Sequence, residues 1–304
     1  MRQAFVQSLL EIAAQDGRLL VLTGDLGFMV FEPFADRFPA RFINAGVAEQ
    51  NMVGVATGLA EAGYIPFVYS IAPFASLRPL EFIRNGPILH NLPVRIVGVG
   101  TGFDYGHAGF THHAIEDIGV LRTQRGLSIV VPADAEQTRS AILATWNTPG
   151  PVYYSLGKAG RGPIPGLSGR FALGRAEIVR VGSGEVVILA MGSVAHEAVA
   201  AAEALGRIDC TVVVLASVAP PPSDDIARIL SKAQIAVTVE THVAVGGIGS
   251  LVSEIVASRA LRCRVVSCAV REGWDGRSGS TEWYLARHGL DRQSVVRRIE
   301  AEYR

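Results

Sequence analysis

The residues best suited to proton chemistry lie in two short stretches of the first half of the chain. Glu49 falls in the first turn of residues 47–62, where the spacing of apolar and small residues predicts a helix. A carboxylate at this position can simply be solvated beside the positive end of the helix dipole. If it is partly buried, desolvation drives it toward its protonated form, and it can exchange a proton with a ligand nitrogen. Glu49 is therefore a candidate catalytic residue.

The second stretch, residues 106–117, holds His107, His112 and His113 between glycines. A loop of this kind at the end of a strand is where an α/β sheet binds ligands. Metal ligation would need further Cys or carboxylate groups at suitable spacing, and none is present. We therefore expect no metal site here and favour proton handling by a histidine.

The elements that must position these residues follow an alternating pattern. Short apolar runs separated by helical patterns predict mostly parallel sheets covered by helices, an α/β fold. The expected strands of the first half are 19–22, 66–69, 94–99, 128–131 and 152–154, and the expected helices are 1–15, 47–62, 78–91 and 134–145. Asp134 with Gln137 three residues later predicts a capping box.

A second α/β series follows the glycine- and proline-rich residues 157–169. Its expected strands are 186–191, 210–215, 235–240 and 263–267, and its helices are 193–205, two that start at 224 and 249, and 292–303. We expect two α/β domains, residues 1–160 and 176–304, joined by a linker at 161–175.

Two glycine-rich turns need a separate explanation. Residues 98–102, Gly-Val-Gly-Thr-Gly, follow a strand, but a dinucleotide fingerprint requires a helix to begin directly afterwards. The next residues have the character of a loop, so a nicotinamide site is disfavoured. The turn at 246–249 is short of the full spacing as well, and a plain tight turn is favoured there.

Composition narrows the functional classes. The 304 residues include 28 basic and 28 acidic side chains, and charged residues make up 18%, below the ~25% typical of soluble domains. Because interfaces are depleted of charge, we expect another chain to cover part of the surface, although a large glycine- and alanine-rich core is the alternative. The balanced charge argues against nucleic acid, and no apolar run is long enough for a membrane span. Three cysteines fit neither a disulfide framework nor a metal knuckle, which favours a cytoplasmic protein.

The two stretches, in this order, resemble the transketolase family of thiamine-diphosphate enzymes. The resemblance covers essentially the whole chain, as a pyrimidine-binding domain followed by a C-terminal domain. It depends on residues 23–26 (Thr-Gly-Asp-Leu), 46–51 (Gly-Val-Ala-Glu-Gln-Asn), 109–112 (Gly-Phe-Thr-His), 116–117 (Glu-Asp), 132–134 (Pro-Ala-Asp) and 239–249. The Gly-Asp-Gly motif with which the family's N-terminal domain holds diphosphate and Mg2+ is not found. The chain is thus similar to the C-terminal component of a split transketolase.

The resemblance implies a role for individual residues toward thiamine diphosphate. Glu49 would contact the aminopyrimidine ring, where a carboxyl group favours the tautomer that can take a proton from the thiazolium carbon. Asp25 would lie beside the thiazolium ring, Leu26 would be the apolar wedge that bends the cofactor, and Phe74 would stack on the pyrimidine. Ordinary core packing is the competing explanation for Leu26 and Phe74.

The resemblance also implies a substrate side and a partner. His112 would hydrogen-bond the substrate, with Tyr105, His107 and Lys158 nearby. Lys158 falls near the family's phosphate-binding arginine and can bind phosphate as a point charge, or it can be a solvated linker lysine. An N-terminal transketolase subunit would hold the diphosphate and Mg2+, and we expect an α2β2 heterotetramer.

The implied reaction moves a two-carbon ketol unit from a ketose, a sugar phosphate or a modified sugar, to an aldehyde. Ala108 replaces an Asp with which the sugar-phosphate enzymes read the acceptor hydroxyl, so the acceptor is expected to be unusual. The beta chain of a 2-oxoacid dehydrogenase, a deoxyxylulose-phosphate-synthase-like enzyme and a non-catalytic scaffold remain as alternatives.

Overall fold

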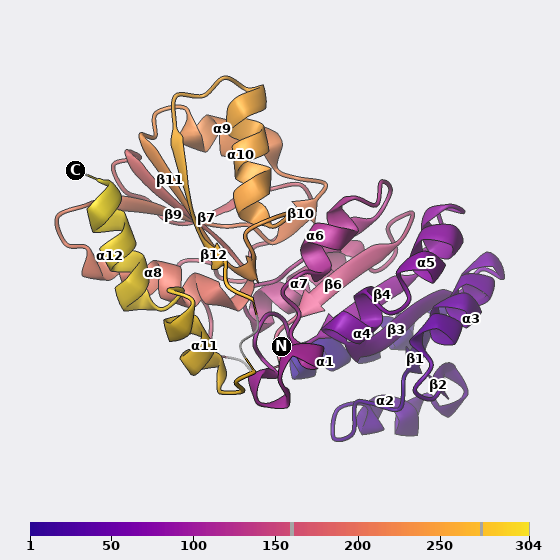
Figure 1. Ribbon diagram of the computed structural model, residues 1–304. Helices are drawn as coiled ribbons and strands as arrows, with labels where there is room; N and C mark the ends of the chain where they lie inside the picture. Colours follow the sequence, from indigo (N-terminus) through magenta and orange to yellow (C-terminus); the bar gives the residue numbers. More distant parts are fainter. Residues whose placement is uncertain (159–160, 274–275, 304) are drawn as a thin grey trace.

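The computed structural model describes residues 1–158, 161–273 and 276–303. Two sheets lie side by side, the first built mainly from the N-terminal half and the second from the C-terminal half (Figure 1). The sequence-based expectation of two mostly parallel, helix-covered sheets is confirmed.

The first sheet has seven strands in the order β10-β5-β6-β4-β3-β1-β2. They are β1 (Leu19–Thr23), β2 (Phe42–Asn44), β3 (Ile65–Ile71), β4 (Arg95–Val99), β5 (Ser128–Val130), β6 (Val152–Leu156) and β10 (Ser217–Ala219). All neighbours pair in parallel except β10, which is antiparallel to β5. The central strands β1, β3, β4 and β6 are buried throughout, as expected when helices cover both faces of a parallel sheet.

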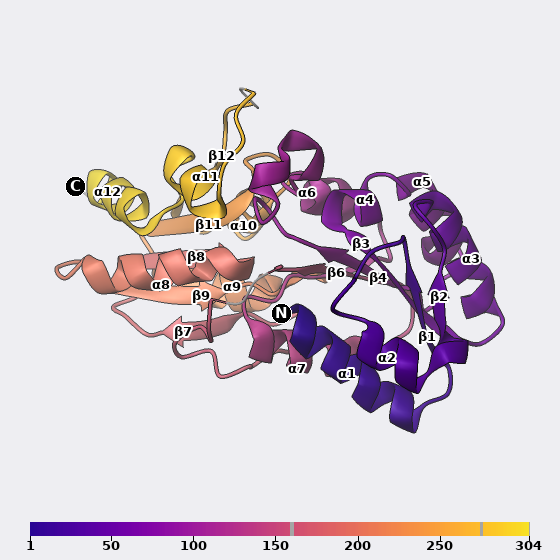
Figure 2. The same cartoon turned by 90° about the horizontal axis from the view of Figure 1, so that it is seen from below.

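Helices cover both faces of this sheet (Figure 2). One face carries α1 (Arg2–Gln15), α2 (Glu32–Arg37) and α7 (Ala135–Thr145). The other carries α3 (Glu49–Glu61), α4 (Ala72–Ser76), α5 (Leu80–Ile83) and α6 (Asp117–Arg122). The predicted cap of α7 is present, because the Asp134 carboxylate accepts the backbone N–H of Gln137 at 2.8 Å.

The second sheet has five strands in the order β12-β11-β8-β9-β7. They are β7 (Glu177–Arg180), β8 (Val186–Met191), β9 (Cys210–Val214), β11 (Ile235–Val243) and β12 (Arg264–Val270). Its helices are α8 (Ala195–Ala204), α9 (Ser223–Leu230), α10 (Ile248–Ser258), α11 (Thr281–Arg287) and α12 (Arg292–Glu302).

The two halves are packed against each other closely. Strand β10 belongs to the C-terminal half of the chain but completes the edge of the first sheet. The glycine- and proline-rich connection is packed rather than free over its described part, since Ile164 and Leu167 are buried. The Asp134 carboxylate also accepts the backbone N–H of Ile164 at 2.8 Å, which fixes this connection to the start of α7.

One predicted helix differs in form. Residues 78–91 were expected to make a single helix, but α5 ends at Ile83 and the chain continues as a π-helical turn, η2 (Arg84–Ile88). Pro87 lies inside this turn and cannot donate a backbone hydrogen bond, which explains why a regular α-helix does not continue.

Candidate active site

The candidate residues gather at one edge of the first sheet. Asp25 and Leu26 follow β1, and Glu49 begins α3 shortly after β2. Phe74 lies on α4 directly after β3. Tyr105, His107 and His112 follow β4, and Lys158 follows β6. Because these strands are parallel, their carboxyl ends meet at the same edge, which is where open α/β sheets bind ligands.

Glu49 is a buried carboxylate with two partners. Its side chain is 1% exposed. The Ser70 hydroxyl donates to Oε1 at 2.8 Å, and the Arg78 guanidinium donates to Oε2 at 2.5 Å. Gly24 lies beside it, and a Cβ on that glycine would stand 3.4 Å from Oε1. Burial alone was considered from the sequence, whereas the structure supplies a hydrogen bond and an ion pair that compensate for the lost solvation.

Phe74 connects Glu49 to the histidine loop. The Arg78 guanidinium carbon lies 4.1 Å from the centre of the Phe74 ring. On its other side, the Phe74 ring meets the His112 ring edge-on, with 5.1 Å between the ring centres. The cluster of Glu49, Arg78, Phe74 and His112 thus places a carboxylate, an aromatic face and an imidazole next to one another.

Tyr105 and Lys158 extend this cluster. The Tyr105 and His112 ring centres are 6.2 Å apart, and the Lys158 ammonium lies 4.5 Å from the centre of the Tyr105 ring. Tyr105 packs closely against Gly100, where a Cβ would collide with the ring. His107 is exposed on the short turn η3 (Gly106–Ala108), so it lies on the rim of the loop.

Asp25 and Leu26 form the third part of the edge. Asp25 has a positive φ of 59°, an uncommon conformation outside glycine, and its carboxylate accepts a hydrogen bond from the Asn44 amide at 2.9 Å. The same Asn44 accepts the backbone N–H groups of Asp25 and Gly46. Leu26 is held by Thr23, whose hydroxyl donates to the Leu26 carbonyl at 2.7 Å.

Three supporting residues were not predicted from the sequence: Ser70, Arg78 and Asn44. Each lies in a stretch that was recognised, at the end of β3, after α4 and at the end of β2. The available signal was the polar residue type at a strand end, since such residues in a buried sheet must find partners. Their partners lie 19 to 29 residues away, a pairing that spacing alone does not reveal.

His113, next to His112, has a different environment. It is buried, and its ring contacts Phe103 and Tyr284 edge-on. Burial lowers the pKa of His113 below its ordinary value. Its surroundings are those of a core residue that joins the two halves of the molecule.

The glycine runs act as packing positions. A Cβ on Gly98 would lie 2.8 Å from the Ala72 Cα, and one on Gly102 would meet Thr241 of the second half. A loop and not a helix follows Gly102, in agreement with the rejection of a nicotinamide site. At the second turn, the buried Glu240 carboxylate accepts the backbone N–H groups of Ile248 and Gly249 at the start of α10.

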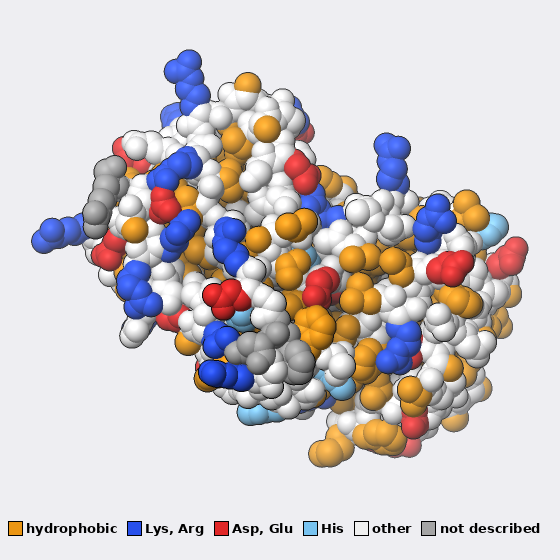
Figure 3. Space-filling model, viewed as in Figure 1, with side chains coloured by type: hydrophobic (Ala, Val, Ile, Leu, Met, Phe, Trp, Pro, Cys, Tyr) orange, Lys and Arg blue, Asp and Glu red, His pale blue; other side chains and the backbone are white. Residues whose placement is uncertain are grey.

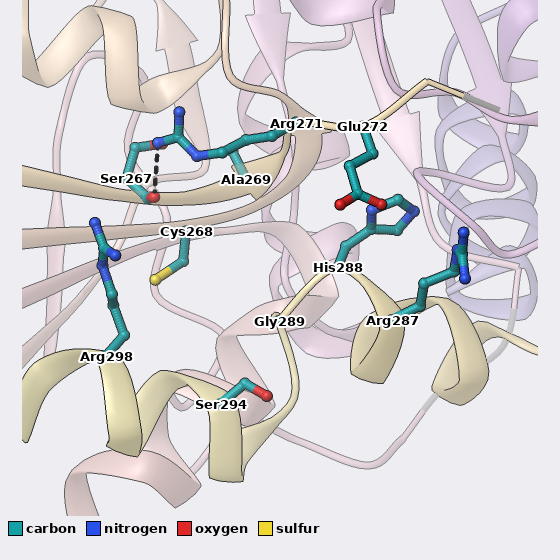
Figure 4. Close-up of a pocket in the computed structure, with 10 residues that line it drawn as sticks. All are labelled: Ser267, Cys268, Ala269, Arg271, Glu272, Arg287, His288, Gly289, Ser294 and Arg298. Atoms are coloured by element: carbon teal, nitrogen blue, oxygen red, sulfur yellow. Dashed lines mark hydrogen bonds between the residues drawn. The ribbon is translucent and has the colours of Figure 1, made fainter. Parts of the chain in front are cut away.

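A further hollow of about 280 Å³ lies in the second half, between β12 and the α11–α12 turn (Figure 4). Arg271, Arg287 and Arg298 line it, and Cys268 lies beside Arg298. Burial raises the pKa of the Cys268 thiol to about 11. This hollow lies on the second sheet, away from the strand ends that hold Glu49 and His112.

Two general findings concern only the part of the chain that the structure describes. None of its helices is both long enough and apolar enough to cross a membrane. Within residues 1–158, 161–273 and 276–303, no group of three or more His, Cys, Asp or Glu side chains could hold a metal ion.

Comparison with known proteins identifies the family. Residues 1–160 match the model of the transketolase pyrimidine binding domain, and residues 174–295 match that of the transketolase C-terminal domain. This chain belongs to the transketolase family.

Relatives match it from end to end. One of the two chains of the apulose-4-phosphate transketolase from Phocaeicola vulgatus is 32% identical over 97% of this chain and 95% of its own length. The SqwH chain of 6-deoxy-6-sulfo-D-fructose transketolase from a Clostridium species is 34% identical over 98% and 92%. A solved structure described as a split gene transketolase, inactive beta4 tetramer, is 33% identical, with a TM-score of 0.88 over 99% of this chain and 96% of that chain.

This chain is therefore the C-terminal component of a split transketolase, a transferase subunit. The end-to-end matches favour this assignment over the deoxyxylulose-phosphate-synthase-like alternative.

Proposed function

We propose that this transketolase subunit provides the aminopyrimidine half of a thiamine-diphosphate site and transfers a two-carbon ketol unit from a ketose to an aldehyde. The convergence of Glu49, Phe74 and His112 at one sheet edge carries the proposal. A carboxylate, an aromatic face and a hydrogen-bonding ring are the groups that a planar heterocycle and a sugar require.

The residues present fit the aminopyrimidine ring. The nearly inaccessible Glu49 carboxylate can hold a proton at a ring nitrogen, and the Phe74 ring offers a face for stacking. Asp25 and Leu26, on the neighbouring loop, would border the thiazolium side. When bound, the cofactor supplies an electron sink for the carbanion that forms as the ketose carbon–carbon bond breaks. The chain's own task is then to orient the reactants and move protons.

The substrate side is formed by His112, Tyr105 and Lys158, with His107 on the rim. His112 is half-buried and can hydrogen-bond a substrate oxygen. The relatives named above act on a sugar phosphate and a sulfo sugar, which both carry an anionic group. The Lys158 ammonium beside Tyr105 supports a similar anionic sugar as the substrate of this chain.

An N-terminal subunit would complete the site. Exposed hydrophobic side chains occur next to the candidate residues: Phe28 is 74% exposed, Met29 95% and Val47 75%. Hydrophobic side chains also gather over this half of the molecule in the space-filling view (Figure 3). Because apolar clusters of this kind mark interaction sites, we infer that the partner covers this rim, holds the diphosphate and Mg2+, and forms an α2β2 heterotetramer. The free cysteines support a cytoplasmic location.

Calorimetric titration with thiamine diphosphate and magnesium tests this proposal. The chain alone, the companion subunit alone and their mixture would be compared. We expect binding only in the mixture, followed by ketol transfer when ketose donors are screened. Absence of binding in a mixture whose subunits demonstrably associate would overturn the cofactor assignment.

A further inference from the structure

Arg78 makes two contacts that together resemble those of a bound ring. Its guanidinium donates to the Glu49 carboxylate at 2.5 Å, and the same planar group lies 4.1 Å from the centre of the Phe74 ring. These are the two side chains that the proposed function assigns to the aminopyrimidine. A guanidinium is itself planar, donates hydrogen bonds and stacks on aromatic faces.

We propose that Arg78 is a positioning residue that stands in for the aminopyrimidine ring while the cofactor is absent. The inference rests on the proposed function, because it takes Glu49 and Phe74 as the ring's contacts. One guanidinium and one ring cannot use the same carboxylate oxygen and the same aromatic face together. Cofactor binding therefore requires Arg78 to move away.

The structure explains why such a stand-in is needed. The Glu49 side chain is 1% exposed, and a buried carboxylate without partners carries a large desolvation penalty. Ser70 satisfies only Oε1, which leaves Oε2 to Arg78. Without the guanidinium, the empty site would hold a buried charge with one oxygen unpaired.

The structure also shows how Arg78 can leave. Its side chain is 39% exposed, so the guanidinium already borders solvent, unlike Glu49. It follows the short helix α4 and precedes Pro79, where the chain turns toward α5. A rotation of this one side chain toward solvent would open the carboxylate and the ring face without any shift of the sheet.

Two variants test the proposal. Arg78→Met and Arg78→Ala remove the guanidinium, and Arg84→Met is the matched control because Arg84 is exposed and hydrogen-bonds only Asn85 in the described contacts. The dissociation constant of thiamine diphosphate with magnesium would be measured calorimetrically on the complex with the companion subunit. The unfolding midpoint of each complex would be recorded with and without the cofactor.

We expect the dissociation constant of both Arg78 variants to fall about tenfold, as it would if the closed arrangement held about nine-tenths of the molecules. Without cofactor, the Arg78 variants should unfold at a lower temperature than the wild type. At cofactor saturation this gap should close, since the ring then pairs with Glu49. Arg84→Met should match the wild type in both measurements.

The two possible failures are distinguishable. If the wild-type complex binds the cofactor and both Arg78 variants bind it equally or more weakly, the proposal is overturned, because Arg78 then supports the bound ring. The proposed function would stand in that case. If neither wild type nor variants bind, the proposed function fails and this inference falls with it.

Discussion

At the scale of single residues, Glu49 offers the most direct test of catalysis. Glu49→Gln keeps the side-chain shape and the Ser70 contact but removes the carboxylate. We expect kcat to fall by about 10²–10⁴-fold or more, the range typical of a lost acid–base group. Glu61→Gln, at the exposed end of the same helix, should leave kcat unchanged. Full activity of the Glu49 variant would instead favour the scaffold alternative.

The adjacent histidines should show opposite phenotypes. His112→Leu removes a hydrogen-bonding group beside Phe74, and we expect kcat/KM to fall by about 10–100-fold, as for the loss of about 1.4–2.7 kcal/mol. His113→Leu should leave kcat/KM within a few-fold, because that ring is buried between Phe103 and Tyr284. Equal losses of kcat/KM in both variants would contradict the assignment of His112 to the substrate.

His113 also predicts a pH dependence of stability. Burial lowers the pKa of His113 in the folded protein, so below its unfolded value of about 6.5 the unfolded chain binds more protons. The stability contributed by the neutral ring is therefore complete above that pH and decreases as the pH falls. We expect the difference in unfolding free energy between wild type and His113→Leu to shrink between pH 8 and pH 5.5 in urea titrations. A constant difference would show that His113 does not titrate differently on folding.

At the scale of elements, Gly98 allows α4 to approach β4. A Cβ there would lie 2.8 Å from Ala72 Cα and 2.6 Å from the Tyr153 hydroxyl oxygen, so Gly98→Ala must displace the helix that carries Phe74. We expect a loss of about 1–3 kcal/mol in unfolding free energy and weaker cofactor binding. Gly58→Ala in α3 has no atom within 4 Å of its Cβ and should stabilise the isolated chain by about 0.5–1 kcal/mol. Chemical denaturation of both variants measures these opposite signs.

Several elements could be predicted because their patterns are local. The buried strands β3 and β4 are continuous apolar runs, and the cap of α7 is a spacing of three residues. Strand β2 has only three residues and is partly exposed, and β10 exists because it pairs with β5 from across the chain. The site shows the same division: Glu49 and His112 could be proposed from their stretches, whereas the Arg78 contact depends on a side-chain approach over 29 residues.

At the scale of the whole molecule, polar contacts join the two halves. The backbone N–H of Gly119 donates to His242 Nε2 at 3.0 Å. Arg122, at the end of α6, donates to the carbonyl oxygens of Gly246 and Gly247 and forms an ion pair of 2.7 Å with Glu254. These contacts connect the loop after His112 to the glycine turn before α10. A shared core and strand β10 reinforce them, so the halves should unfold together.

Arg122→Met tests this coupling. The arginine is 14% exposed, so its bonds to two carbonyls and a carboxylate are shielded from solvent, and their loss should cost about 2–3 kcal/mol. In urea we expect one transition at a lower midpoint, followed equally by circular dichroism and tryptophan fluorescence, because the remaining interface keeps the halves coupled. Arg125→Met, at an exposed position three residues later, should leave the midpoint unchanged. Two separated transitions in the wild type would show instead that each sheet folds independently and that the interface only aligns them.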